Sequence, residues 1–95
     1  MTGLVFDVAA PVEVYDELHA KVLARMGTDV SGLLVHLARA TDGGFQVIDV
    51  WESREDSDRY YREIQQIAGG PSLADATVTE FEVHGLVVPA AAVTR

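Results

Sequence analysis

The chain has 95 residues, of which 15 are acidic and seven basic, giving a formal net charge of −8. This length fits a single domain, residues 1–95, and the acidic balance disfavours nucleic acid and anionic membrane surfaces as partners, because both are bound through basic patches. The absence of cysteine excludes disulfides, thiolate nucleophiles and cysteine-ligated metal centres. The first residues show no secretory signal, and no apolar run approaches the roughly 20 residues of a membrane span. These features together predict a cytoplasmic protein.

Strand and helix patterns alternate in the first half of the chain. Residues 4–9 are rich in β-forming residues and predict a strand. Pro11 is placed to open a helix whose apolar residues recur at helical spacing as far as Met26, and Gly27 is expected to end it. Residues 32–40 and 45–52 predict two strands, joined by a tight turn at Asp42 and Gly43.

The second half begins with the pattern of a helix N-terminus, Ser53-Arg54-Glu55-Asp56, in which a serine side chain can accept the backbone N–H three residues on. The helix is expected to run to about Ala68 and to end at residues 69–71, Gly-Gly-Pro. Residues 77–84 predict the last strand, and the apolar tail 86–95 predicts a short extra edge strand. The order β-α-β-β-α-β is ferredoxin-like, an α+β fold with two helices on one face of a four-stranded antiparallel sheet.

Alternation along the strands predicts two unlike sheet faces. The face expected under the helices is almost wholly apolar and comprises Leu4, Phe6, Val8, Leu33, Val35, Leu37, Ile48, Val50, Phe81 and Val83. The opposite face is mixed and comprises Val5, Asp7, Leu34, His36, Ala38, Phe45, Val47, Asp49, Trp51, Glu80, Glu82 and His84. Because an open face this apolar is expected to be covered, we predict a homodimer of facing sheets whose polar members line a cavity or its mouth.

The mixed face contains every candidate functional residue. Trp51 can stack on an aromatic ligand or pack across a dimer interface. His36 can act as a general base or as a hydrogen-bonding group of the interface. Asp49, its expected neighbour in the hairpin, can orient His36 or make a surface hydrogen bond. The remaining candidate ligand-binding residues on this face are Phe45, Leu34 and His84.

No metal site is predicted. His84 alternates with Glu80 and Glu82, but the chain has no closely spaced histidine pair, and a site needs three or four converging ligands. The two glutamates are more simply a charged strand face. On the second helix, Tyr60 and Tyr61 can reach the expected ligand pocket, although packing in the core is favoured for at least one of them.

The element order and the strand-to-helix junction at residues 47–55, Val-Ile-Asp-Val-Trp-Glu-Ser-Arg-Glu, resemble the dimeric α+β barrel superfamily, in particular the small antibiotic-biosynthesis-monooxygenase-like proteins. The resemblance implies a barrel of two facing sheets, with a pocket between sheet and helices or inside the barrel. It implies activities that range from cofactor-independent oxygenation of phenolic or quinol-like molecules to haem degradation. It also implies a role for Trp51 in the site.

The chain departs from these enzymes at several positions. The haem-degrading branch uses an Asn in the first strand and a His in the second helix, but this chain has no Asn and no His between residues 56 and 68. The Asn of the quinol-oxidising branch also has no counterpart. The expected function is a cofactor-independent monooxygenation of a small aromatic molecule bound against Trp51, with His36 assisting proton removal and Asp49 orienting the imidazole. The alternative is a non-catalytic small-ligand-binding or structural homodimer.

Overall fold

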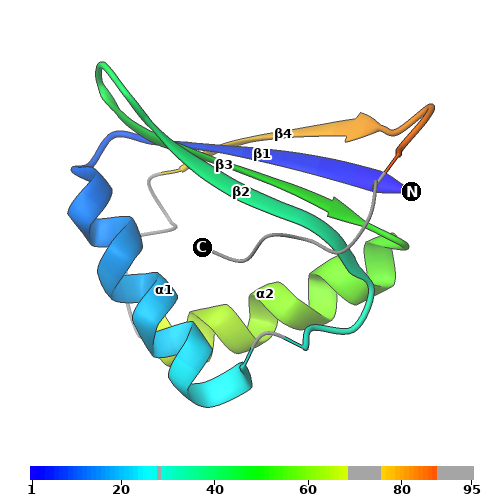
Figure 1. The fold of residues 1–95 in the computed structure, drawn as a ribbon, viewed down its shortest axis with the longest axis horizontal. Helices are drawn as coiled ribbons and strands as arrows, with labels where there is room; N and C mark the ends of the chain where they lie inside the picture. The colour runs from blue at the N-terminus through cyan, green and yellow to red at the C-terminus, as the bar shows by residue number, and fades with distance from the viewer. Residues whose placement is uncertain (28, 69–75, 88–95) are drawn as a thin grey trace.

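The computed structural model describes residues 1–27, 29–68 and 76–87. Its elements in chain order are β1 (Thr2–Val8), α1 (Val12–Met26), β2 (Leu33–Thr41), β3 (Gly44–Trp51), α2 (Arg54–Ala68) and β4 (Thr77–Glu82). The strands form one antiparallel sheet in the order β2-β3-β1-β4, and both helices lie on the same side of it (Figure 1). The predicted ferredoxin-like α+β fold is confirmed.

The ends of the helices follow from local sequence. Pro11 lies one position before the first helical residue, in extended conformation with φ −59° and ψ 147°. Gly27, at φ 69°, ends α1, and its N–H donates to the carbonyl oxygen of Leu23 at 2.9 Å. Ser53 caps α2 as predicted, because its Oγ accepts the backbone N–H of Asp56 at 3.2 Å.

The last strand is shorter than predicted, since β4 ends at Glu82 and not at His84. The extra edge strand predicted for residues 86–95 is absent at Leu86 and Val87, and residues 88–95 lie outside the described part of the chain. The predicted helix terminator at 69–71 also lies outside it. Within the described ranges, no helix is long and apolar enough to cross a membrane.

The register of the sheet corrects the predicted faces. Leu4 of β1 pairs with Asp49 of β3, and Phe6 pairs with Val47. Because directly opposite residues project to the same side, Asp49 shares a face with Leu4 and not with Val5. The helices cover this face, since Phe6 and Asp49 line a common cavity with side chains of α1 and α2. The prediction that Ile48 and Val50 face the helices is therefore wrong, because they lie on the open face. The prediction also grouped Leu4 and Phe6 of β1 with Ile48 and Val50, whereas they share the covered face with Asp49.

Hydrophobic alternation failed here because the more apolar face of the sheet is the open one. The open face carries Val5, Val35, Leu37, Ile48, Val50 and Phe81, of which Leu37 is 44 % exposed and Phe81 40 % exposed. Conversely, Asp49 is only 2 % exposed, and its burial is tolerated because hydrogen bonds satisfy the carboxylate. Trp51 is fully buried in the core, together with Leu4, Val8, Val22, Phe45 and Ile64.

Candidate functional site

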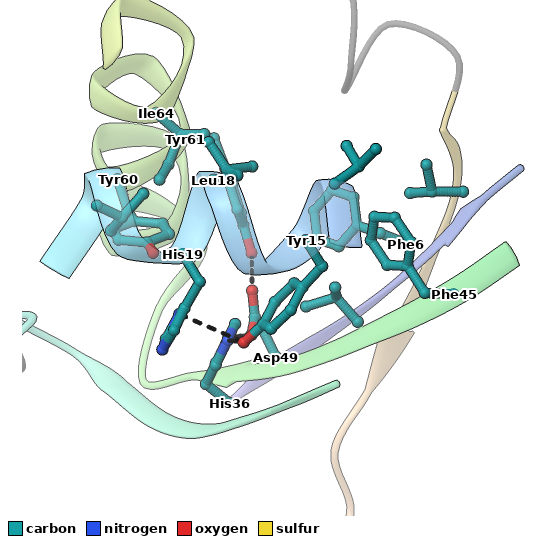
Figure 2. A pocket seen from close by; sticks show the side chains of 14 residues that line it. Phe6, Tyr15, Leu18, His19, His36, Phe45, Asp49, Tyr60, Tyr61 and Ile64 are labelled. Atoms are coloured by element: carbon teal, nitrogen blue, oxygen red, sulfur yellow. Dashed lines mark hydrogen bonds and ion pairs between the residues drawn. The ribbon is translucent and has the colours of Figure 1, made fainter. Parts of the chain in front are cut away.

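A cavity of about 60 Å³ lies between the sheet and the two helices (Figure 2). Phe6 and Phe45 line it from the sheet, and Leu18 and Ile64 line it from the helices, so most of its wall is apolar. Figure 2 shows the histidines His19 and His36 on one side of Tyr15 and the two phenylalanines on the other. A space of this size holds a few water molecules in the present conformation.

Asp49 is the centre of a chain of hydrogen bonds beside this cavity. Its Oδ1 lies 2.6 Å from Nδ1 of His36, and its Oδ2 accepts the hydroxyl of Tyr61. His36 stands opposite Asp49 in the β2–β3 register, so the contact predicted from the hairpin is present. The Asp49 side chain is 2 % exposed and that of His36 is 26 % exposed. The carboxylate is therefore buried while the imidazole reaches toward solvent.

The chain of hydrogen bonds extends beyond both partners of Asp49. On one side, the Tyr15 hydroxyl lies 2.8 Å from Nε2 of His36 and 3.3 Å from Nδ1 of His19. On the other side, Nε1 of Trp51 donates to the hydroxyl oxygen of Tyr61 at 3.3 Å. Among the described residues, no buried side-chain nitrogen or oxygen lacks a partner. The cluster is thus fully hydrogen-bonded in spite of its burial.

With Asp49 ionised and His36 neutral, the direction of each hydrogen bond in this chain follows. An ionised carboxylate only accepts, so Nδ1–H of His36 and the hydroxyl of Tyr61 both donate to Asp49. A neutral imidazole that carries its proton on Nδ1 accepts at Nε2, so the Tyr15 hydroxyl donates there. The Tyr15 oxygen in turn accepts from His19. Because all protons point toward Asp49, Nε2 of His36 is the basic atom of the site.

The tyrosines of the site are held in their protonated form. Burial and, secondly, the charge of Asp49 raise the pKa of Tyr60 to about 12. The same two causes, with the hydrogen bond to Asp49, raise the pKa of Tyr61 above its ordinary value. Burial first, then the charges of Asp49 and Asp16, raise the pKa of Tyr15. The hydroxyls of Tyr15 and Tyr61 are therefore able to donate, which agrees with the direction of the chain.

Three of the predicted site residues, His36, Asp49 and Phe45, line the cavity. Trp51 does not line it: its side chain is fully buried and is joined to the cavity through its hydrogen bond to Tyr61. Leu34 and His84 are also outside the lining, and His84 lies exposed beyond the end of β4. In the described part of the chain, no three His, Asp or Glu side chains converge as a metal site.

Tyr15 and His19 were not predicted as site residues. They are four residues apart on α1, so they project from the same side of the helix, and their rings stack with centroids 5.2 Å apart. The available signal was a tyrosine and a histidine spaced to face the sheet. This spacing points to the site only if α1 is known to cover the sheet face that contains His36. Alternation along the strands predicts instead that the helices cover the opposite face.

No family model and no curated protein matches the chain. Solved structures do match it. A putative antibiotic biosynthesis monooxygenase from Deinococcus radiodurans is 16% identical with a TM-score of 0.64, covering 96% of this chain and 100% of that one. The heme-degrader MhuD from Mycobacterium tuberculosis is 23% identical with a TM-score of 0.60, covering 93% and 100%. The cofactor-independent oxygenase SnoaB from Streptomyces nogalater, as a mutant, is 17% identical with a TM-score of 0.56, covering 94% and 95%.

These likenesses extend over nearly the whole of each chain, and at such low identity they establish the fold. They agree with the resemblance seen in the strand-to-helix junction at residues 47–55. The protein therefore has the fold of the antibiotic biosynthesis monooxygenase-like proteins.

Proposed function

We propose that the cavity binds a small hydroxylated aromatic molecule of the quinol type and that His36 removes its hydroxyl proton, so that the bound molecule reacts with dioxygen without a cofactor. The observation that carries this proposal is the 2.6 Å contact between His36 Nδ1 and Asp49 Oδ1 beside an apolar, aromatic-lined cavity. A buried carboxylate stabilises the imidazolium that forms when Nε2 takes up a proton. His36 is then the general base, and Asp49 orients it.

The walls of the cavity suit an aromatic ring. Phe45 and Phe6 of the sheet and Tyr60 of α2 offer ring faces and edges, which favour stacked or edge-on aromatic partners. Tyr15 already uses one such contact, with its ring edge-on to Phe45 at 5.9 Å between centroids. In this account Trp51 supports the site indirectly, because its N–H fixes the hydroxyl of Tyr61 on Asp49.

The reaction needs no electron source other than the substrate. Loss of the hydroxyl proton to His36 gives a phenolate whose ring carbon bonds to dioxygen. The resulting peroxide takes the proton back from His36. Its O–O bond and the C–H bond of the same ring carbon then break, so one oxygen atom remains as a ring carbonyl and the other leaves as water together with that hydrogen. His36 acts first as base and then as acid, and returns to its starting state. SnoaB, a cofactor-independent oxygenase with a similar fold, supports this reaction class.

A haem group is a poorer fit to this cavity. The present space of about 60 Å³ is far below the roughly 300–1,000 Å³ of usual ligand sites. Any ring must displace side chains from this space, and a macrocycle would have to displace many more of them than a molecule of one or two rings.

We further infer that a second copy of the chain covers the open face of the sheet. Val5, Val35, Leu37, Ile48 and Phe81 form an apolar surface around the buried Val50, and this surface is bordered by Asp7, Arg39 and Gln46, which hydrogen-bond to one another. An apolar patch with a polar border is typical of a protein interface, and twofold pairing is the commonest solution. This homodimer would use the face opposite to the one predicted from alternation.

Oxygen uptake tests the proposed function. The probe is a dihydroxynaphthalene with one hydroxyl on each ring, whose oxidation consumes dioxygen and forms a quinone, and a protein-free blank corrects for autoxidation. We expect His36→Ala to lower the protein-dependent rate about a hundredfold or more, because a positioned base contributes roughly 10²- to 10⁴-fold. Asp49→Asn should lower it as well, whereas the matched Asp7→Asn, on the open face, should not.

An oxygen uptake that is unchanged in His36→Ala would exclude His36 as the base. Binding of the probe without any protein-dependent oxygen uptake would instead support the non-catalytic alternative, a small-ligand-binding homodimer.

A further inference from the structure

We propose that the ring of Tyr15 occupies the place of a phenolic ligand in the cavity, and that a one-ring phenol binds by displacing this ring and donating its own hydroxyl to Nε2 of His36. The inference rests on the proposed function, because it names the ligand class and the side chain that the ligand must replace at the base.

The side chain of Tyr15 has the structure of para-cresol, and its surroundings in the cavity are those expected for a bound phenol. Its hydroxyl lies 2.8 Å from Nε2 of His36, the basic atom of the site. Its ring packs edge-on against Phe45 at 5.9 Å and lies nearly parallel to His36, at 6.0 Å between centroids. An apolar wall with one well-placed acceptor is the usual construction of a site for a small aromatic molecule.

Nε2 of His36 cannot accept a hydrogen bond from a ligand while Tyr15 keeps this position. Nε2 of His36 has one lone pair, and the Tyr15 hydroxyl uses it. The space left beside Tyr15 is about 60 Å³, whereas an apolar cavity known to bind benzene in another protein is about 150 Å³. A ring bound at His36 therefore needs both the acceptor and the volume that Tyr15 now occupies.

Tyr15 is less confined than the most buried groups of the site. Its side chain is partly exposed, in contrast to the fully buried Asp49 and Trp51. Its second hydrogen bond, at 3.3 Å, goes to His19 on the same helix, so α1 itself does not have to unfold when the ring rotates. Beyond its own helix, the ring is held in the cavity by its hydrogen bond to His36 and by its edge-on contact with Phe45.

Ligand binding to three variants tests this inference, with free para-cresol as the probe and toluene as its hydroxyl-free counterpart. Tyr15→Ala removes the ring and should bind para-cresol with the highest affinity. Tyr15→Phe keeps the ring but loses its hydrogen bond to His36, so it should bind para-cresol about two- to tenfold more tightly than the natural chain. Calorimetric titration gives these affinities directly.

A comparison of para-cresol with toluene tests whether His36 is the acceptor of the ligand hydroxyl. In Tyr15→Ala, para-cresol should bind several-fold more tightly than toluene, and adding His36→Ala should abolish that difference. Leu18→Ala is the matched control, because it also enlarges the cavity but leaves Tyr15 on His36. It should show no preference for para-cresol over toluene.

Equal para-cresol affinity in the natural chain and in Tyr15→Phe would overturn the inference, as would equal binding of para-cresol and toluene to Tyr15→Ala. If Tyr15→Ala does not fold, the comparison with Tyr15→Phe decides alone. These titrations involve no oxygen, so a chain that binds as described but consumes no oxygen would refute the proposed reaction and leave the displacement of Tyr15 intact.

Discussion

His36 and Asp49 stand opposite one another on β2 and β3, with Nδ1 and Oδ1 2.6 Å apart, under a layer of helices and not on the open surface of the sheet. The antiparallel register of the hairpin produces this pair, since opposite residues share a face. The helices then bury the carboxylate and leave one edge of the imidazole accessible. Both the stability of the cluster and its proposed chemistry follow from this placement.

Removal of the Tyr61 hydroxyl should destabilise the protein. Tyr61→Phe leaves Oδ2 of Asp49 and the N–H of Trp51 without their shared partner, and it should lower the free energy of unfolding by about 1–3 kcal/mol. Tyr60→Phe is the control, because its hydroxyl makes no hydrogen bond to any described residue, and it should change stability by less than about 0.5 kcal/mol. Urea denaturation measures both variants. Equal stability of the two would show that the hydroxyl of Tyr61 has no structural role.

The tyrosines should titrate late and make the fold sensitive to alkali. A group whose pKa is raised in the folded state contributes stability that is complete below its unfolded value, 10.0 for tyrosine, and is lost as pH rises through the folded value, about 12 for Tyr60. We therefore expect no tyrosinate absorbance near pH 10 while circular dichroism still reports the folded state. Stability should fall as the pH rises from there. Tyrosinate formation near pH 10 in the folded protein would contradict this expectation.

The two glycines of the β2–β3 hairpin should differ sharply in their tolerance of alanine. A Cβ on Gly44 would lie 2.0 Å from the carbonyl oxygen of Val8, whereas a Cβ on Gly43 meets nothing within 4 Å. Because the contact at Gly44 is with backbone, relief requires a shift between β1 and β3, and Gly44→Ala should lower stability by about 1–3 kcal/mol. Gly43→Ala should change it by about 0.5 kcal/mol or less. Thermal unfolding of the two variants measures this difference, and equal loss of stability in both would contradict the prediction.

The open face of the sheet should control the oligomeric state. The natural chain is expected to sediment as a dimer, and Leu37→Glu should give a monomer, because it places a charge within the apolar surface. Leu23→Glu is a matched control on α1, since Leu23 is 39 % exposed and Leu37 is 44 % exposed. It should leave the dimer intact. A natural chain that sediments as a monomer, or a dimer insensitive to Leu37→Glu, would refute the proposed interface.

The sequence was sufficient for the fold because each element has its own local signal. The cap formed by Ser53, the stop at Gly27 and the hairpin at residues 42–43 each depend on neighbouring residues only. The contact between His36 and Asp49 was predictable for the same reason, since a short hairpin brings its flanking residues into register.

The choice of the covered face could not be predicted from alternation. The set containing Ile48 and Val50 is the more apolar one, and the set containing Asp49 looks too polar for a core. What makes the polar set suitable for burial is a network contributed by the β2–β3 hairpin and both helices, with Tyr15 from α1 and Tyr61 from α2 satisfying the groups of the sheet. Because the hydrogen-bond partners of this carboxylate come from distant parts of the chain, they leave no periodic signal in the sequence.

The tautomer of His36 tests the central claim most directly, because the whole network depends on Nε2 being the unprotonated, basic nitrogen. Nitrogen NMR of the natural chain, with the His36 signals assigned by their loss in His36→Gln, should show that the neutral imidazole carries its proton on Nδ1. Asp49→Asn should weaken this preference, because the acceptor of the Nδ1 proton is lost. A neutral His36 protonated at Nε2 in the natural chain would contradict the account.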